Sequence, residues 1–339
     1  MPTYVRTQEI AHDIGPDGRF SLRVTSPDVE LRATDATTAT VRVQFEIRAP
    51  SDADADQAFE RLRFDVHQAD GLLEVGEPRQ GERVSGMVAR ILGMRGDRLD
   101  VSVSAEVPAG ATLVYQGVSS DLTASGFTGE QQYRTVSGDL VLDRVAGAVR
   151  VNGVSSDVSI RADAPTRLEA NTVSGDLSAA APRLEGVRVV TVSGDVELDG
   201  QLAPGAAHRI ETVSGDLSLG IAGGLALEVR GLSTEASVAL PHRTEGSRDR
   251  RRFVIGDGGA ELLFSSMSGD VVVHASRRFG APATPPTPPA PPRPPVPAAP
   301  PKPAAVDEAT QLAILRALER GDIDVDEAAR RLAGEAPDA

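Results

Sequence analysis

The feature that most constrains the fold is a six-residue phrase, Thr135-Val136-Ser137-Gly138-Asp139-Leu140, that recurs along the chain. Counted from serine to serine, its copies are separated by steps of 18, 18, 19, 19, 21, 19 and 35 residues. The copies have their serines at Ser119, Ser137, Ser155, Ser174, Ser193, Ser214, Ser233 and Ser268. A short period built from β-forming and turn residues is typical of a solenoid with one repeat per coil. We predict a mainly β protein, a single-stranded, β-helix-like solenoid of about 18–19 residues per coil.

The composition agrees with a narrow interior. Hydrophobic residues make up 40% of the chain, but aromatic residues only 3%, and there is no Trp. We therefore expect a core of Val, Leu, Ile and Ala. The absence of Cys excludes disulfides, a thiol nucleophile and Cys-ligated metals. The net charge of −14 argues against nucleic acid as a partner, because phosphate binding needs clustered Lys and Arg.

Residues 1–15 contain no apolar run of the kind that a Sec signal peptide carries, and no window of the chain reaches 18 apolar residues. We therefore expect a cytoplasmic protein, with membrane association limited to peripheral contact.

The positions within each repeat predict which side chains face the core. Counted from the motif valine, apolar residues follow at +4 and +6 and precede at −5 and −3. Alternation along a strand places the valine, +4 and +6 on one inward face. Position +2 is always Gly, Ser or Thr, which indicates crowding. The odd offset of −5 and −3 predicts a bend just before the motif, at Asn152-Gly153, Asn171-Thr172 and Glu211-Thr212.

The repeated Ser and Asp have outward parity, so stacked coils should carry a column of each on the surface. An Asp at such a position commonly shapes its turn by bonding the local backbone. A calcium-binding column is the alternative, although the glycine-dense nonapeptide of calcium solenoids is missing. The five His residues share no ligand spacing, and no catalytic motif occurs. We therefore expect no enzyme, no catalytic residues, no cofactor and no metal site.

The chain divides by composition into four parts. We predict an N-terminal cap with the first coils over 1–110, the repeat solenoid over 111–279, a Pro-rich linker over 280–305, and a helical hairpin over 306–339. Within the first part we expect an early coil over 20–31, strands at 41–47, 72–75 and 99–107, and a helix over 51–63.

Residues 83–98 interrupt the β pattern. Apolar residues at helical spacing form one stripe, flanked by Arg83, Arg90, Arg95 and Arg98. The stripe consists of Val84, Met87, Val88, Ile91 and Leu92. Such a segment either contacts anionic lipid or a partner groove, or lies as a cap over the end of the solenoid. Burial as a cap is the simpler interpretation.

A second candidate surface is the stretch 243–252, which we expect to be a loop. It concentrates basic residues in an acidic protein, at Arg243, Arg248, Arg250, Arg251 and Arg252. A phosphate or lipid headgroup is one expected contact, and simple solvation of the loop is the other.

The linker and tail carry the third candidate. Thirteen of the 24 prolines fall within 282–303, typical of a polyproline-II spacer with a reach of roughly 70 Å. The tail then shows two short amphipathic helices, with apolar residues at Leu312, Leu315, Leu318, Val325 and Leu332. Two such helices cannot bury a core alone, so we expect them to self-associate or to dock onto a protein partner.

The iterated Thr-Val-Ser-Gly-Asp-Leu phrase, with the 41–47 strand, the short helix and Val107-Pro108-Ala109-Gly110-Ala111, resembles a bacterial adhesin-like β-strand-repeat family of unknown function. That family belongs with the toast-rack domains of phage-shock and envelope-stress systems. The tail from Ile314 through Leu332 looks like the short bihelical (SHOCT-like) modules attached to many such proteins.

The resemblance implies a non-enzymatic scaffold in envelope-stress sensing or organisation, with the tail as its docking module. Two alternatives stay open at this point. The first is a polymerising, bactofilin-like cytoskeletal solenoid, and the second is a secreted adhesin or calcium-binding solenoid.

Overall fold

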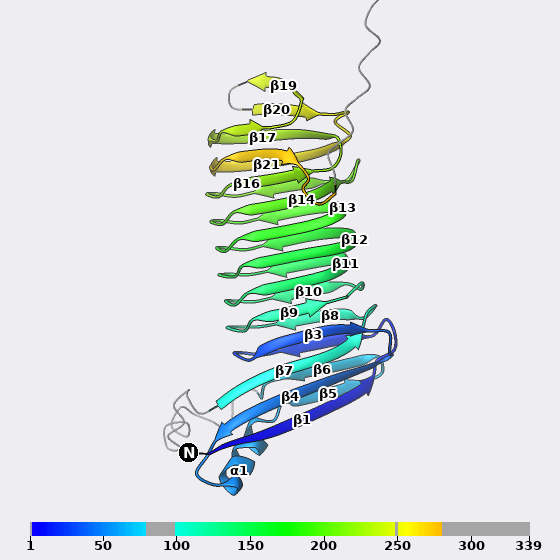
Figure 1. The fold of residues 1–339 in the computed structure, drawn as a ribbon, viewed down its shortest axis with the longest axis vertical. Helices are drawn as coiled ribbons and strands as arrows, with labels where there is room; N and C mark the ends of the chain where they lie inside the picture. Colours follow the sequence, from blue (N-terminus) through cyan, green and yellow to red (C-terminus); the bar gives the residue numbers. More distant parts are fainter. Residues whose placement is uncertain (1, 79–98, 248–249, 280–339) are drawn as a thin grey trace, which may run out of the picture. The chain divides into compact units, whose positions relative to one another are not determined.

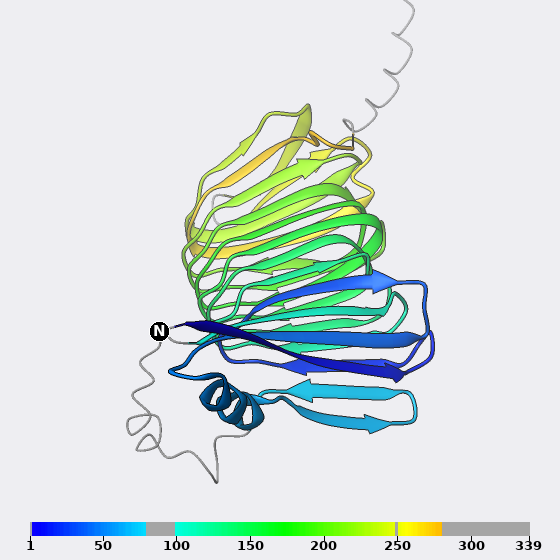
Figure 2. The same ribbon diagram turned by 60° about the horizontal axis from the view of Figure 1, so that its bottom comes forward.

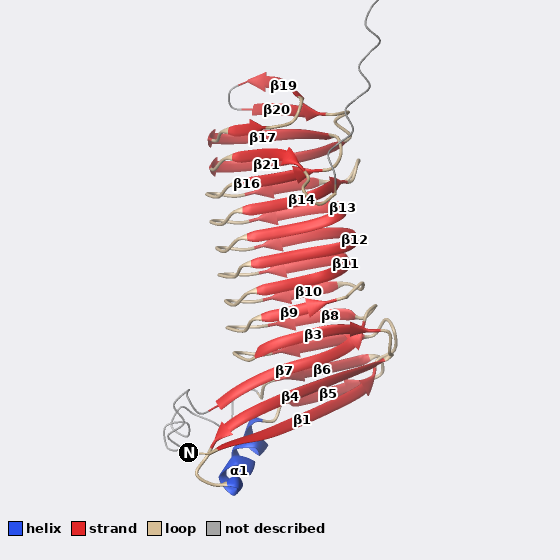
Figure 3. Cartoon of the chain, in the orientation of Figure 1, coloured by secondary structure: helices blue, strands red, loops and turns tan. Residues whose placement is uncertain are grey.

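The computed structural model describes residues 2–78, 99–247 and 250–279. Within these residues the chain forms 22 β-strands and one α-helix, and the strands join into a single hydrogen-bonded sheet that winds into coils (Figures 1 and 3). The predicted linker and tail, 280–339, lie outside the described residues, so the boundaries proposed for them stay predictions.

Each coil contributes two strand segments, which are continuous in β11, β12 and β13 and which stack on the equivalent segments of the next coil in parallel register. Residues at the same position of successive repeats are paired: Val149 pairs with Leu168, and Val187 pairs with His208. The strands of the central coils are β8 (Thr112–Gln116), β9 (Leu122–Ser125), β10 (Gln131–Arg134), β11 (Leu140–Asn152), β12 (Val158–Asn171), β13 (Leu177–Val190), β14 (Val196–Leu202), β15 (His208–Glu211) and β16 (Leu217–Ile221). The predicted solenoid is therefore confirmed.

The core is the narrow column enclosed by these strands. The apolar residues at +4 and +6 and at −5 and −3 are buried in coil after coil, as predicted. Examples are Leu140, Leu142, Val149, Val151, Leu168, Ala170, Val187 and Val189. Tyr115 and Tyr133 add a tilted pair of buried rings, with centroids 6.5 Å apart, in the first central coils.

The corner of each coil lies at the motif itself, which corrects the predicted bend. β10 ends at Arg134 and β11 begins at Leu140, so the Val-Ser-Gly-Asp residues form the turn between them. The motif serines join successive corners through isolated parallel bridges, such as Ser137 to Ser155. Figure 3 shows these turns aligned along one edge, whereas β11–β13 run unbroken around the other. The crowded +2 position forces the chain to turn there rather than earlier.

The coil predicted over 20–31 is confirmed. It consists of β2 (Arg19–Arg23) and β3 (Asp28–Thr34), which stack in parallel on β8 and β9. On the other side of this coil lie β6 (Leu72–Gly76) and β7 (Leu99–Pro108), also in parallel register. β6 and β7 thus form one more coil.

Antiparallel strands cover the N-terminal end of the stack (Figure 2). β4 (Thr38–Arg48) pairs antiparallel with both β7 and β1 (Thr3–Asp13), and β5 (Asp65–Ala69) pairs antiparallel with β6. The strands expected at 41–47, 72–75 and 99–107 are all present. A switch to antiparallel pairing ends the parallel stack, so that no bare coil faces solvent at this end.

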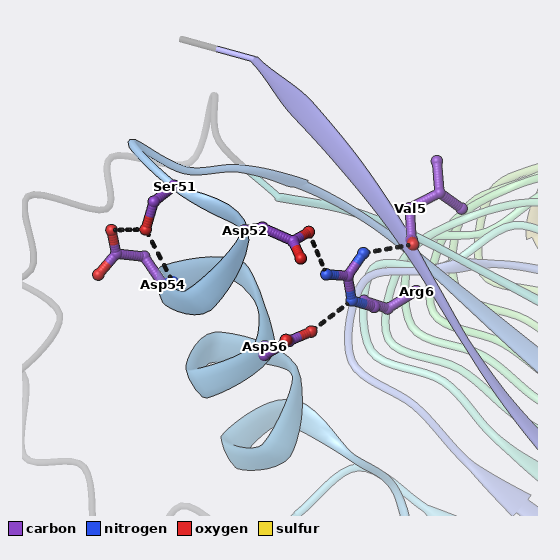
Figure 4. Close-up of polar contacts among 6 residues, drawn as sticks. All are labelled: Val5, Arg6, Ser51, Asp52, Asp54 and Asp56. Carbon is purple, nitrogen blue, oxygen red and sulfur yellow. Dashed lines mark hydrogen bonds and ion pairs between the residues drawn. The ribbon is translucent and has the colours of Figure 1, made fainter.

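The predicted helix is α1 (Asp52–Leu62), which packs under β4. Ser51 caps it by accepting a hydrogen bond from the Asp54 N–H, and Ala55 and Ala58 are its buried residues. Arg6 of β1 holds the first turn through ion pairs with Asp52 (2.6 Å) and Asp56 (2.7 Å), shown in Figure 4. The helix is thereby fastened to the outermost strand of the cap.

At the C-terminal end the spatial order of the strands departs from their order in sequence. β21 (Ala260–Ser268) lies between β15 and β17 (Leu225–Ser233), in parallel with both. β22 (Val271–Ala275) likewise lies between β16 and β18 (Ala236–Val238). The last coil in sequence is therefore inserted beneath the coil that precedes it, which the 35-residue step alone does not reveal.

The stretch 243–252 was expected to be a loop, and this prediction is wrong. β19 (His242–Ser247) and β20 (Arg250–Ile255) form an antiparallel pair, and β20 pairs antiparallel with β17. Between β18 and the inserted β21 the chain has to cross back over β17. It does so as a hairpin, because a buried sheet edge would otherwise leave its backbone groups without partners.

One core residue should make folding stability depend on pH. His208 is buried in β15, its Nε2 lies 3.0 Å from the Ala203 carbonyl oxygen, and its Nδ1 has no hydrogen-bond partner within the described residues. Burial lowers the pKa of this imidazole below the ordinary value near 6.5. The unfolded chain therefore takes up a proton below about pH 6.5 that the folded chain does not.

We expect the free energy of unfolding to fall as the pH drops below about 6.5, by at most about 1.4 kcal/mol per pH unit for this one proton. Urea unfolding at pH 7.5 and pH 5.5 measures the effect. His208→Leu should flatten the dependence, whereas replacing the exposed His67 by Gln should leave it unchanged. An equal pH dependence in the wild type and His208→Leu would contradict the assignment.

Candidate interaction surface

The corner turns are built around a close contact between backbones. At Gly138 and Gly175, in the +2 position, φ is +107° and +110°. A Cβ atom on Gly138 would lie 2.5 Å from the Ser120 carbonyl oxygen, and one on Gly175 would lie 2.2 Å from that of Ser156. The crowding predicted at +2 is confirmed, and it comes from the corner of the preceding coil.

The motif valine does not fill the core, which overturns the predicted inward orientation. Six motif valines are between 43% and 49% exposed, while Met267 and Leu232 at the same position are 57% and 87% exposed. The valines are Val118, Val136, Val154, Val173, Val192 and Val213. The reason is the position of the corner: inward alternation ends at the residue before the motif, such as the buried Thr135. These eight residues form what we call the valine column.

A carboxylate column runs beside the valine column. In most corners the backbone N–H of the motif Asp donates to the Oδ1 atom of the Asp in the coil next to it. The measured pairs are Asp139 to Asp121 (2.8 Å), Asp176 to Asp157 (2.8 Å), Asp195 to Asp176 (2.8 Å) and Asp216 to Asp195 (2.9 Å). The sequence indicated local turn bonding. The structure shows instead that these carboxylates connect one coil to the next.

Both columns stay continuous across the inserted coil. The Asp270 N–H donates to Asp216 Oδ1 (2.7 Å), and the Glu235 N–H donates to Asp270 Oδ1 (3.1 Å). The order in space is therefore 216, 270, 235 rather than the order in sequence. Eight apolar side chains thus lie next to eight exposed carboxylates along one edge of the molecule, the edge where the turns align in Figure 1.

Of the basic residues predicted as an anion site, Arg250, Arg251 and Arg252 are engaged within the protein, whereas Arg243 on β19 is exposed. Arg250 pairs with Glu228 (2.7 Å), and Arg252 pairs with Glu261 (3.0 Å). Arg251 donates to the Thr234 carbonyl oxygen. The Arg250 hydrogen bond holds the pKa of Glu228 below its usual value. These three side chains lie along β20, where their partners hold them apart from a common ligand.

The remaining sequence candidates fall outside the described residues. They are Val84, Met87, Val88, Ile91 and Leu92 of the 83–98 segment, Arg248, and Leu312, Leu315, Leu318, Val325 and Leu332 of the tail. Their roles stay predictions. Over 2–78, 99–247 and 250–279, no three His, Asp or Glu side chains gather closely enough to hold a metal ion. No helix in the same ranges is long and apolar enough to cross a membrane.

A family model called Toastrack DUF4097 matches residues 18–274, which covers the stacked coils and the cap apart from β1. The chain belongs to this Toastrack family. The match agrees with the resemblance drawn from the repeated phrase, and it adds no ligand or reaction. A comparison with curated proteins finds no match.

Several solved structures match this chain at low identity. A protein described as a "putative adhesin" from Bacteroides fragilis is 10% identical, with 80% of this chain and 97% of that chain covered and a TM-score of 0.32. A "putative lipid binding protein" from Parabacteroides distasonis is 12% identical (80% and 96%, TM-score 0.30). A "putative cell adhesion protein" from Clostridium sporogenes is 7% identical (79% and 99%, TM-score 0.24). Scores this low carry no site from those proteins to this Toastrack chain.

Proposed function

We propose that this Toastrack protein is a non-enzymatic interaction scaffold that acts in the sensing or organisation of bacterial envelope stress, from the cytoplasmic side. The observation that carries the proposal is the valine column, an exposed apolar stripe maintained through eight coils. Continuous exposed apolar surface on a folded chain commonly marks a site of interaction. The surface is held rigidly, because every coil is bonded to its neighbours on both sides.

The covered ends favour a scaffold over an end-to-end polymer. At one end of the described stack lie the antiparallel strands β1, β4 and β5, and at the other the β19–β20 hairpin. A filament built by stacking solenoids needs a bare parallel coil at each end to continue the register. Antiparallel strands interrupt that register over β6 and β7 at one end and over β17 at the other.

In this proposal the remaining parts of the chain serve recruitment. The Pro-rich segment 280–305 supplies reach, and the helices of 306–339 supply a docking or self-association module. The 83–98 segment supplies peripheral membrane contact.

The experiment is proximity labelling in the source bacterium, with and without a membrane-damaging agent. The full chain is compared with a chain ending at 279, which keeps every described strand. We expect an envelope-stress protein among the partners of the full chain, its labelling to change under stress, and the signal to weaken without 280–339. An unchanged partner set in both chains, or filaments of the shorter chain in electron micrographs, would contradict the proposal.

A further inference from the structure

We propose that the valine and carboxylate columns together form a docking site for one basic amphipathic α-helix of a partner protein. The inference rests on the proposed scaffold function and names the chemistry of its partner. Three properties of the corner edge carry it: its dimensions, its repeat distance and its charge.

The dimensions exclude a second copy of the chain as the occupant. Eight rungs at about 4.8 Å make a stripe about 34 Å long but only one side chain wide. A standard interface buries about 800 Å² on each partner, far more than such a stripe offers. Two copies facing each other along this edge would also bring their carboxylate columns together, and like charges across an interface oppose association.

The repeat distance fits a helix better than a strand. Side chains on one face of a helix recur about every 5.4 Å along its axis, close to the rung spacing of about 4.8 Å. On one face of an extended strand they recur about every 6.8 Å, which loses register within two rungs. A helix lying along the column drifts by only about 0.6 Å per rung, so it can place one apolar side chain against each of about four or five consecutive motif valines. The stripe has room for about 22 helical residues.

The charge specifies a basic helix. Seven aspartates and Glu235 line one side of the valines, and all eight are exposed. They are Asp121, Asp139, Asp157, Asp176, Asp195, Asp216, Asp270 and Glu235. Lys or Arg on the flank of a bound helix would meet this row, which favours association and fixes its orientation. The chain's own tail has the wrong sign for this site, with nine acidic and four basic residues in 306–339.

The test uses the full chain and a synthetic 21-residue helical peptide with Leu at heptad positions a and d and Lys at e and g. A second peptide carries Glu in place of Lys. We expect the Lys peptide to bind with a micromolar Kd that weakens with added salt, and the Glu peptide to bind at least tenfold more weakly. Isothermal titration calorimetry measures both.

Two triple variants assign the binding to the columns. Val154→Ser, Val173→Ser and Val192→Ser together should weaken binding of the Lys peptide at least tenfold. Asp157→Asn, Asp176→Asn and Asp195→Asn should also weaken it and reduce its salt dependence. Asn keeps the side-chain oxygen that accepts the backbone N–H of the next coil, so the fold is retained. The matched control replaces exposed valines outside the column, Val66, Val141 and Val272, by Ser.

Wild-type affinity in both column variants, equal binding of the Lys and Glu peptides, or an equal loss in the control would each overturn the inference. A self-associated wild type that the Val→Ser variant makes monomeric would also overturn it, in favour of a second copy. Failure here is distinguishable from failure of the scaffold proposal, because recruitment through 280–339 is measured separately by proximity labelling.

Discussion

A chain that ends at residue 259 is expected to lose the folded C-terminal end of the solenoid, whereas a chain that ends at 279 is expected to keep it. The first truncation removes β21 and β22, which lie between two other coils rather than at the end of the stack. Their inward residues are almost fully buried: Ala260, Leu262, Phe264, Val271 and Val273.

The expected effect is large because burial of each large apolar side chain contributes about 1.5–3 kcal/mol, and a whole domain is stable by only about 5–15 kcal/mol. In a stack where each coil contacts only its neighbours, the loss should be local to β15–β20. Hydrogen exchange read by mass spectrometry should show lost protection over 208–255 and retained protection over 112–190. The chain ending at 279 is the control.

Unchanged protection of 225–233 in the shorter chain would contradict this prediction. It would mean that β17 re-forms its parallel ladder directly on β15 once the inserted strand is gone. The same chain would then have two stacking orders of similar stability.

Gly175→Ala is expected to lower the free energy of unfolding by about 2–5 kcal/mol. Part of this, about 1–2 kcal/mol, is the cost of a left-handed backbone conformation for a residue with a Cβ. The rest is the contact of that Cβ with the Ser156 carbonyl oxygen, which would be 2.2 Å away. The neighbouring coil must move apart to relieve it, at a typical overpacking cost of about 1–3 kcal/mol.

Gly205→Ala separates the two contributions. Gly205 also has a positive φ, +73°, but nothing lies within 4 Å of the position that its Cβ would take. It should therefore lose only about 1–2 kcal/mol. Urea unfolding of both variants measures the difference. Equal losses would show that the corner contact between coils contributes nothing beyond backbone strain.

Much of the fold was predictable from local pattern. A period near 19 residues, with apolar residues at fixed offsets, constrains a chain to coils of equal length, and the buried rows at Leu140 and Val149 follow from it. The helix over 52–62 was equally accessible, because Ser51, Ala55 and Ala58 mark its cap and its buried face within one short window. These features depend on residues close together in sequence.

The orientation of the motif valine could not be predicted from local pattern. Extending strand alternation through Val136 predicts burial, but alternation holds only where the backbone stays extended, and the corner interrupts it at that residue. The one available signal was position +2. A Gly there at positive φ indicates a turn centred on the motif, which turns the valine toward solvent.

The sequence by itself thus determined the solenoid, its period, the buried aliphatic rows and the outward aspartates, while the core also buries rings such as Phe20, Phe127 and Tyr133. Only the tertiary structure decided three further features: the exposed valine column, the bonding of each Asp to the next coil, and the insertion of β21–β22 beneath β17–β18. The physical reason is that all three depend on contacts between different coils. The repeated phrase gives every coil nearly the same backbone edge, so each coil could pair with several others. Which coils become neighbours is therefore decided only when they pack together.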